Sequence, residues 1–162
     1  MANRSPQAMT AGQFVARQNR VIRIAKTFGF VGNIEYRHVY SQTGGAQYGC
    51  GSKQEADLLT VFAEAFERDA DPEDFSLEGI IAHECGHQIL ARHPRISRRV
   101  AAISEASEEI LASLLGAMIC NAETDRITLF AKATAELLDH GQSAASANRQ
   151  LQALWDLLEA LL

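Results

Sequence analysis

The fold is decided by the stretch IIAHECGHQI, which occupies residues 80–89. In an α-helix, at about 100° per residue, positions four apart lie on one face, so His83 and His87 point the same way. Two imidazoles at this spacing can hold one zinc ion, and Glu84 can reach the water that such an ion activates. The stretch therefore predicts one Zn²⁺ bound by His83 and His87, with Glu84 as the catalytic base.

The residues around the two histidines are uncharged, as expected of a helix that is buried on most sides. A charge at Cys85 or Gly86 would have favoured the alternative, a surface helix with two solvated histidines. The segment matches the zincin motif H-E-x-x-H at every position, and in this respect the chain resembles a zincin metallopeptidase.

The composition predicts a single domain over residues 1–162, because this length suits one hydrophobic core. An apolar fraction of 47% excludes a disordered chain, and a net charge of −5 argues against general nucleic-acid binding. A short run of arginines departs from this acidic balance: Arg92, Arg95, Arg98 and Arg99. We expect them to be solvated, with a substrate or partner contact as the alternative.

The three cysteines, Cys50, Cys85 and Cys120, form neither a C-x-x-C pair nor an even disulfide set, so we expect free thiols that are mostly buried. No apolar run is long enough to span a membrane, and the polar start of the chain lacks the apolar core of a signal peptide. These features predict a cytoplasmic protein. The sequence does not indicate an oligomeric state.

Before the motif, the sequence predicts a loose tail over residues 1–9 and a helix from Thr10 to Phe28. Alternation predicts a strand over residues 33–41, which a glycine turn joins to a second hairpin arm at 46–50. Residues 52–69 are ambiguous between one helix and a strand at 57–62 followed by a helix at 63–69, and we favour the second. An acidic, proline-containing segment at 71–74 predicts the start of the motif helix, which Pro94 ends near Arg92.

After the motif, three helices are expected, at residues 98–121, 122–139 and 144–162. The last of these is interpreted as a packing helix that closes the core, with a dimer face or a cover over the cleft as alternatives. The expected fold class is therefore α+β: a mostly helical domain with a small antiparallel sheet before the motif helix and a further helix that carries a glutamate after it.

A catalytic zinc site normally has three protein ligands, so a third ligand must be found. His93 has the metzincin spacing, but Leu90 stands where that pattern needs a glycine for the turn. Glu109 is favoured, because on a continuous helix it falls within a stripe of small residues that would let two helices approach closely: Ala102, Ala106, Ser113, Gly116 and Cys120. Glu105 and Glu108 remain alternatives.

The segment EILAS at residues 109–113 is similar to the E-x-x-A-D or E-x-x-A-N segment of gluzincins, a group that includes thermolysin, the CAAX-prenyl-protease family, repressor-cleaving metallopeptidases and the minigluzincins. The resemblance implies that Glu109 is the third ligand, within a zincin-like domain. In the family, the fourth residue after the glutamate is an acid or amide that supports a histidine ligand. Here Ser113 replaces it, and its hydroxyl can still accept from an imidazole N–H.

The sequence thus predicts a zinc peptidase that hydrolyses a peptide or protein substrate. One alternative is a metal-binding or regulatory domain with little turnover, which the replacement at Ser113 favours. Another is a peptide deformylase, in which Cys50 would be a ligand, although the segment around it matches poorly. Tyr36, Tyr40 and Tyr48 are candidates for stabilising an oxyanion, and the sequence does not select among them.

Overall fold

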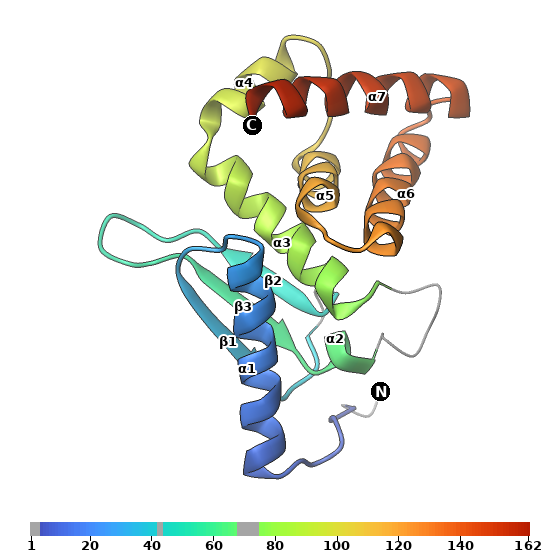
Figure 1. Cartoon of the computed structure of the whole chain (residues 1–162). Helices are drawn as coiled ribbons and strands as arrows, with labels where there is room; N and C mark the ends of the chain where they lie inside the picture. The colour runs from blue at the N-terminus through green and yellow to red at the C-terminus, as the bar shows by residue number, and fades with distance from the viewer. Residues whose placement is uncertain (1–3, 42–43, 68–74) are drawn as a thin grey trace.

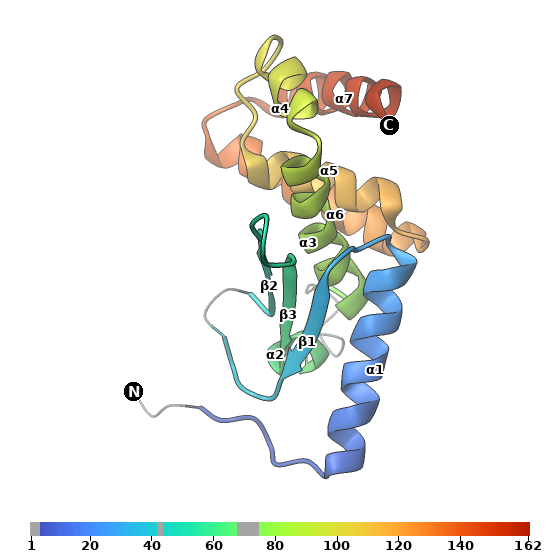
Figure 2. The same cartoon turned by 90° about the vertical axis from the view of Figure 1, so that its left-hand side faces the viewer.

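A computed structural model describes residues 4–41, 44–67 and 75–162 of the chain. The described elements are α1 (Ala11–Thr27), β1 (Asn33–Arg37), β2 (Ala46–Gly49), β3 (Leu58–Phe62), α2 (Glu64–Glu67), α3 (Leu77–Arg92), α4 (Pro94–Ala101), α5 (Glu108–Ile119), α6 (Glu123–Asp139) and α7 (Ala144–Leu161). The predicted α+β class is confirmed. Helix α3, which carries the motif, lies between the sheet with α1 on one side and α5, α6 and α7 on the other (Figures 1 and 2).

The sheet is mixed rather than antiparallel, and the predicted hairpin is wrong. Its strand order is β1-β3-β2, with β1 parallel and β2 antiparallel to β3. The apolar strand β3 takes the central position, where both of its edges are paired, so β1 and β2 lie on opposite sides of it and do not pair with each other. The first strand also ends at Arg37, before the predicted end at residue 41.

The elements before the motif otherwise follow the sequence closely. A capping box between Thr10 and Gln13 starts α1, and Gly29 follows its end at a φ of +83°. The favoured strand-then-helix interpretation of residues 57–69 is confirmed by β3 and α2 as far as residue 67, and its last two positions lie outside the described residues. The predicted helix start at 71–74 also lies outside them. Within the described part, α3 begins at Leu77 after the cap Ser76, so residue 75 precedes the helix.

The predicted helix at 98–121 is wrong, because two helices with a break between them occupy this region. Pro94 starts α4 directly after α3, and α4 ends at Ala101. Ser107 then caps a new helix by accepting from the Ile110 backbone N–H at 3.4 Å, and Ser104 accepts from the Ala106 N–H at 3.1 Å. These hydroxyls satisfy backbone donors that have no partner within a helix, which favours a break over continuation. The later helices, α6 and α7, match their predictions to within a residue.

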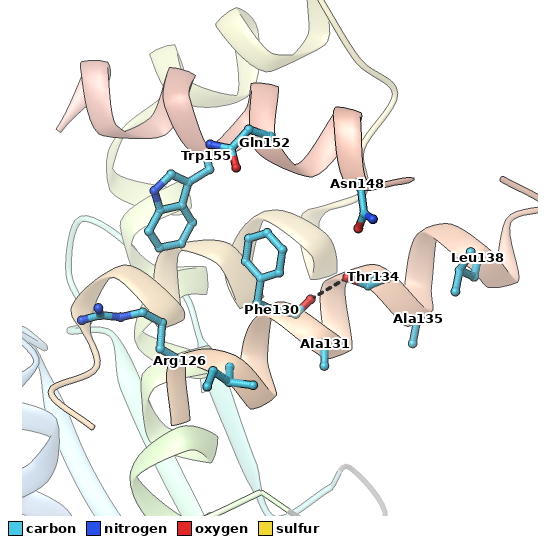
Figure 3. A pocket seen from close by; sticks show the side chains of 10 residues that line it. Arg126, Phe130, Ala131, Thr134, Ala135, Leu138, Asn148, Gln152 and Trp155 are labelled. Atoms are coloured by element: carbon cyan, nitrogen blue, oxygen red, sulfur yellow. Dashed lines mark hydrogen bonds between the residues drawn. The ribbon is translucent and has the colours of Figure 1, made fainter. Parts of the chain in front are cut away.

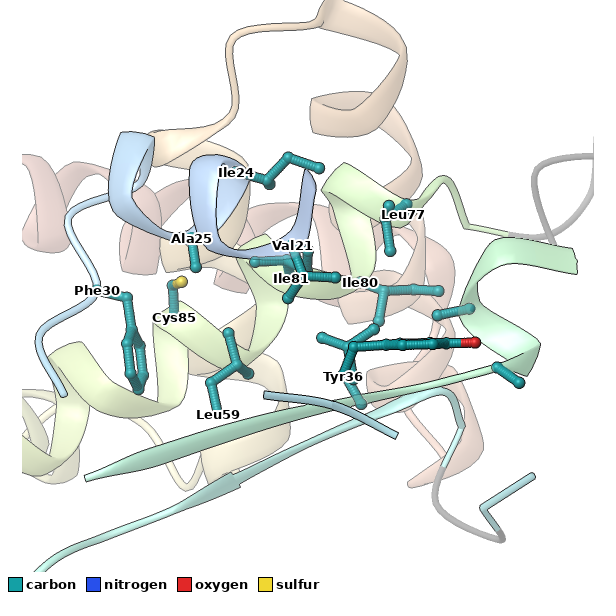
Figure 4. Close-up of a cluster of buried hydrophobic side chains, with 14 residues drawn as sticks. Val21, Ile24, Ala25, Phe30, Tyr36, Leu59, Leu77, Ile80, Ile81 and Cys85 are labelled. Carbon is teal, nitrogen blue, oxygen red and sulfur yellow. The ribbon is translucent and has the colours of Figure 1, made fainter. Parts of the chain in front are cut away.

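Two apolar clusters meet at α3, which is why this helix is apolar on most sides. On its sheet side, side chains of α1 and α3 such as Val21 and Ile81 pack against one face of the sheet, where they meet Leu59 of β3 (Figure 4), and all three are fully buried. On its other side, the second cluster is built mainly by α5, α6 and α7, with Leu114 and Leu151 fully buried. The motif is thereby fixed between two halves of the core.

Helices α6 and α7 leave an apolar groove of about 640 Å³ on their outer surface (Figure 3). Phe130 and Trp155 face each other across it, with ring centroids 6.0 Å apart. The groove shares no lining residue with the motif on α3. Among the described residues, no helix has the combination of length and apolar character that crossing a membrane requires.

Candidate metal centre

Two glycines allow α3 and α5 to approach closely at the motif. A Cβ on Gly86 would lie 2.2 Å from the carbonyl oxygen of Ala112, and a Cβ on Gly116 would lie 2.9 Å from that of Ala82. Each helix therefore contributes one glycine that faces the backbone of the other. The sequence anticipated a stripe of small residues at this contact, although the break before α5 removes Ala102 and Ala106 from it.

The close approach brings His83, His87 and Glu109 together. The Nε2 atoms of the two histidines lie 3.2 Å apart. One carboxylate oxygen of Glu109 lies 3.0 Å from Nε2 of His83, and the other lies 3.1 Å from Nε2 of His87. Of the described residues, these three form a group of a size that could hold a metal ion.

The second nitrogen of each imidazole has its own partner, which orients the ring. Nδ1 of His87 lies 2.9 Å from Oε1 of Glu108, and a carboxylate can only accept, so this nitrogen carries the proton. Nδ1 of His83 lies 3.1 Å from the hydroxyl of Ser113, which is fully buried. Both rings thus direct Nε2 toward the carboxylate of Glu109. The hydroxyl of Ser113 takes the supporting position beside His83 that the sequence predicted for it.

The spacing of the three groups fits a zinc ion. Ligand atoms at about 2.0–2.1 Å from zinc, separated by the tetrahedral angle, lie about 3.3 Å from one another. The three separations observed here are 3.0, 3.1 and 3.2 Å. When His87 is protonated at Nδ1, its Nε2 has no proton, so it and the carboxylate both offer lone pairs to the same point. A cation bound between these groups would accept their lone pairs.

The electrostatics of the motif suit metal binding and base catalysis. Burial lowers the pKa of His83 to about 3, with smaller contributions from Lys132 and His87, so its ring is neutral near pH 7, as a ligand must be. Burial raises the pKa of Glu84 to about 7, and the charge of Glu109 raises it further, whereas the charges of His87 and Lys132 lower it. A carboxylate with this pKa can both accept and return a proton near neutral pH.

Glu84 also contacts the edge of the sheet, because the backbone N–H of Tyr48 donates to its carboxylate. Phe62 N–H donates to the Gly45 carbonyl across the β2–β3 pair, and in the alternating antiparallel pattern the backbone groups of Ala46 and Tyr48 then point to the free edge of β2. A groove of about 360 Å³ lies between this edge and the motif.

The other ligand candidates are not brought into this group. His93 is exposed at the junction of α3 and α4, and Glu105 is exposed in the break before α5. Cys50 is exposed after β2, and the sulfur required by the deformylase alternative is absent from the ligand group found among the described residues. Glu108 contacts His87 at Nδ1, on the side of the ring away from Glu109, so it orients this ring and does not join the group.

Of the three tyrosines, only Tyr48 lines the groove at the motif. The hydroxyl of Tyr36 contacts Arg17 and His38, and that of Tyr40 donates to Glu67 at 2.6 Å. The hydroxyl of Tyr48 donates to Asp57 at 2.8 Å, so it is occupied as well. None of the three presents a hydroxyl without a partner to the site.

Sequence reasoning missed Asp57 and Gln88, which fix the motif helix to the sheet. The Gln88 amide donates to Asp57 at 2.8 Å and exchanges two hydrogen bonds with the backbone of Val31, at 2.6 and 3.0 Å. Asp57 also accepts from Tyr48 and from the Gly51 N–H, each at 2.8 Å. The one signal in the sequence is the amide of Gln88, a polar residue between His87 and Ile89 on a helix that the sequence predicts to be buried on most sides.

Comparisons of the chain with protein-family models, with curated proteins and with solved structures gave no match.

Proposed function

We propose that the chain is a zinc-dependent peptidase similar to gluzincins, in which His83, His87 and Glu109 hold one zinc ion. The observation that carries this proposal is the convergence of two imidazole nitrogens and one carboxylate at 3.0–3.2 Å. Bound there, zinc would supply Lewis acidity for a water molecule and for the carbonyl of a peptide bond. The half-exposed carboxylate of Glu109 leaves the group open to solvent on one side, as a catalytic zinc site requires.

Glu84 is proposed as the general base. Its raised pKa, to about 7, lets it take a proton from the attacking water and return it to the leaving amine. The Tyr48 backbone N–H holds its carboxylate at the end of the β2 groove. A peptide in this groove could pair with the free edge of β2 through its own backbone, which would align the scissile bond with Glu84.

The test is Glu84→Gln, which keeps the shape of the side chain and removes its basicity. We expect the variant to bind one zinc ion per chain and to lose 10²- to 10⁴-fold or so in the rate of peptide cleavage. Cleavage at the wild-type rate would refute the role of Glu84. Wild-type protein that binds no zinc would refute the proposal as a whole.

A second candidate function is a domain that binds zinc but turns over little substrate. Ser113 favours it, because an uncharged hydroxyl on His83 supports a ligand less firmly than a carboxylate does. Zinc binding without cleavage of any member of a diverse peptide library would decide for this candidate.

A further inference from the structure

A second hollow adjoins the β2 groove at the motif. Its volume is about 340 Å³, and Glu84 and Glu109 line both spaces. Three apolar side chains line it, Phe75 before α3, Ile80 on α3 and Leu129 on α6, together with the polar side chains of His83, Glu84, Glu109 and Lys132. A peptide that follows β2 past Glu84 would direct a neighbouring residue into this hollow.

Lys132 on α6 is the one lysine or arginine among the described residues that line the hollow. Its ammonium lies 5.4 Å from the centre of the Phe75 ring, within the range of a cation–π contact. No carboxylate oxygen of the described residues lies within 4.0 Å of it, although its charge is close enough to act on His83 and Glu84. Lys132 is half-buried, so its charge acts partly shielded from water.

An ammonium in such a place selects its ligand by charge. It has three N–H donors and no acceptor, and the carboxylates of Glu84 and Glu109, which also line the hollow, lie beyond ion-pair distance of it. A basic substrate residue would be repelled, and a purely apolar one would cover the ammonium without giving it an acceptor. A carboxylate on a short apolar stem would match both the ammonium and the apolar side chains of Phe75, Ile80 and Leu129.

We propose that this hollow is a substrate subsite in which Lys132 binds a carboxylate of the peptide next to the scissile bond. The inference rests on the proposed peptidase function and extends it to a substrate class, namely peptides that are acidic at this position. The carboxylate could belong to an acidic side chain or to the peptide's own C-terminus, since both have the same chemistry. Lys132 then determines specificity and does not take part in the proton transfers of Glu84.

The experiment uses the full-length, zinc-loaded chain and four peptides of one sequence: Glu or Gln at the position beside the cleaved bond, each with a free or an amidated C-terminus. Binding is measured by calorimetry, and kcat and KM are measured separately. Lys132→Met removes the charge from a side chain of similar length, and Lys132→Arg keeps a positive charge at this position. Lys53→Met is the control, because Lys53 is an exposed lysine in a distant segment of the chain. Thermal unfolding establishes that each variant is folded.

We expect wild-type protein to favour the acidic member of one peptide pair by about 10- to 100-fold, the range of a hydrogen bond to a charged group. The Glu/Gln pair identifies a side-chain carboxylate, and the acid/amide pair identifies a terminal one. Lys132→Met should abolish this preference through KM and the dissociation constant, Lys132→Arg should restore part of it, and Lys53→Met should change nothing.

Equal binding of all four peptides by the wild type would overturn the inference, with no variant needed. If Lys132→Met lowers kcat equally on all four peptides, the inference is also overturned. Such a loss would mean that Lys132 stabilises the transition state and does not select the substrate. If no peptide is cleaved, the peptidase function fails, and the calorimetric preference and its response to Lys132→Met still decide whether the hollow binds a carboxylate.

Discussion

The close contact between α3 and α5 predicts that a side chain at Gly86 would destabilise the protein. The substitution Gly86→Ala places a methyl group 2.2 Å from the Ala112 carbonyl oxygen, whereas ordinary contact begins at 3.4 Å, so the helices must separate by roughly 1.2 Å, the difference between these distances. Alanine gains about 1 kcal/mol in helix propensity. Overpacking against rigid backbone costs about 1–3 kcal/mol or more, so the net effect is a loss of stability.

The same displacement acts on the ligands, because His83 lies on α3 and Glu109 on α5. Metal–ligand distances tolerate only about 0.2 Å, so a separation of this size should weaken zinc binding by about 100-fold or more. Gly116→Ala is the graded comparison, since its methyl group would lie 2.9 Å from the Ala82 oxygen. Gly12→Ala in α1 is the control, because the nearest atom to its methyl group is 3.9 Å away.

The assays are chemical unfolding and competition for zinc with a chelator. We expect Gly86→Ala to be the least stable variant and the weakest zinc binder, with Gly116→Ala intermediate. Gly12→Ala should be as stable as the wild type or slightly more so. A Gly86→Ala protein with wild-type stability and wild-type zinc affinity would refute the claim that close helix packing builds the site.

Three further predictions follow from individual contacts. Glu108→Gln should keep one zinc ion per chain but weaken its binding about 10-fold, measured by chelator competition, because Nδ1 of His87 loses a charged partner; unchanged affinity would contradict this. The pKa of Asp57 is lowered by hydrogen bonds from Gln88 and the Gly51 backbone, so Asp57 stabilises the fold above its ordinary pKa of 3.8 and loses this effect as pH falls through its folded pKa. Unfolding of Asp57→Asn measured from pH 7 to pH 2 should therefore depend less on pH than that of the wild type, and equal slopes would refute the assignment. A thiol reagent should modify Cys50 quickly and the two buried cysteines only on unfolding, and fast modification of all three in the folded chain would argue against the fold.

The motif helix and its glutamate partner could be predicted because each leaves a local signal. His83 and His87 share a helical face at their spacing in the sequence. Glu109 and Ser113 lie on one face of α5, and that phase holds whether or not the helix extends back to residue 98. The sequence therefore predicted that these four side chains would meet, as they do.

Contacts that depend on where an element ends, or on a third element, could not be predicted. Glu108 was an alternative third ligand, but it lies in the first turn of α5, where the chain has just entered the helix, and its side chain reaches Nδ1 of His87. The expected hairpin failed because β3, which comes later in the chain, lies between β1 and β2 and pairs with both. Lys132 reaches the site only through the packing of α6 on α3, which leaves no pattern in its own segment.

The central claim is that a carboxylate from α5 completes a metal site begun by two histidines on α3. Zinc content and affinity of purified wild type, Glu109→Ala and His93→Ala test it most directly. We expect one tightly held ion in the wild type and in His93→Ala, and a loss of about 100-fold or more in affinity in Glu109→Ala. Undiminished zinc binding by Glu109→Ala, or its loss in His93→Ala, would contradict the account.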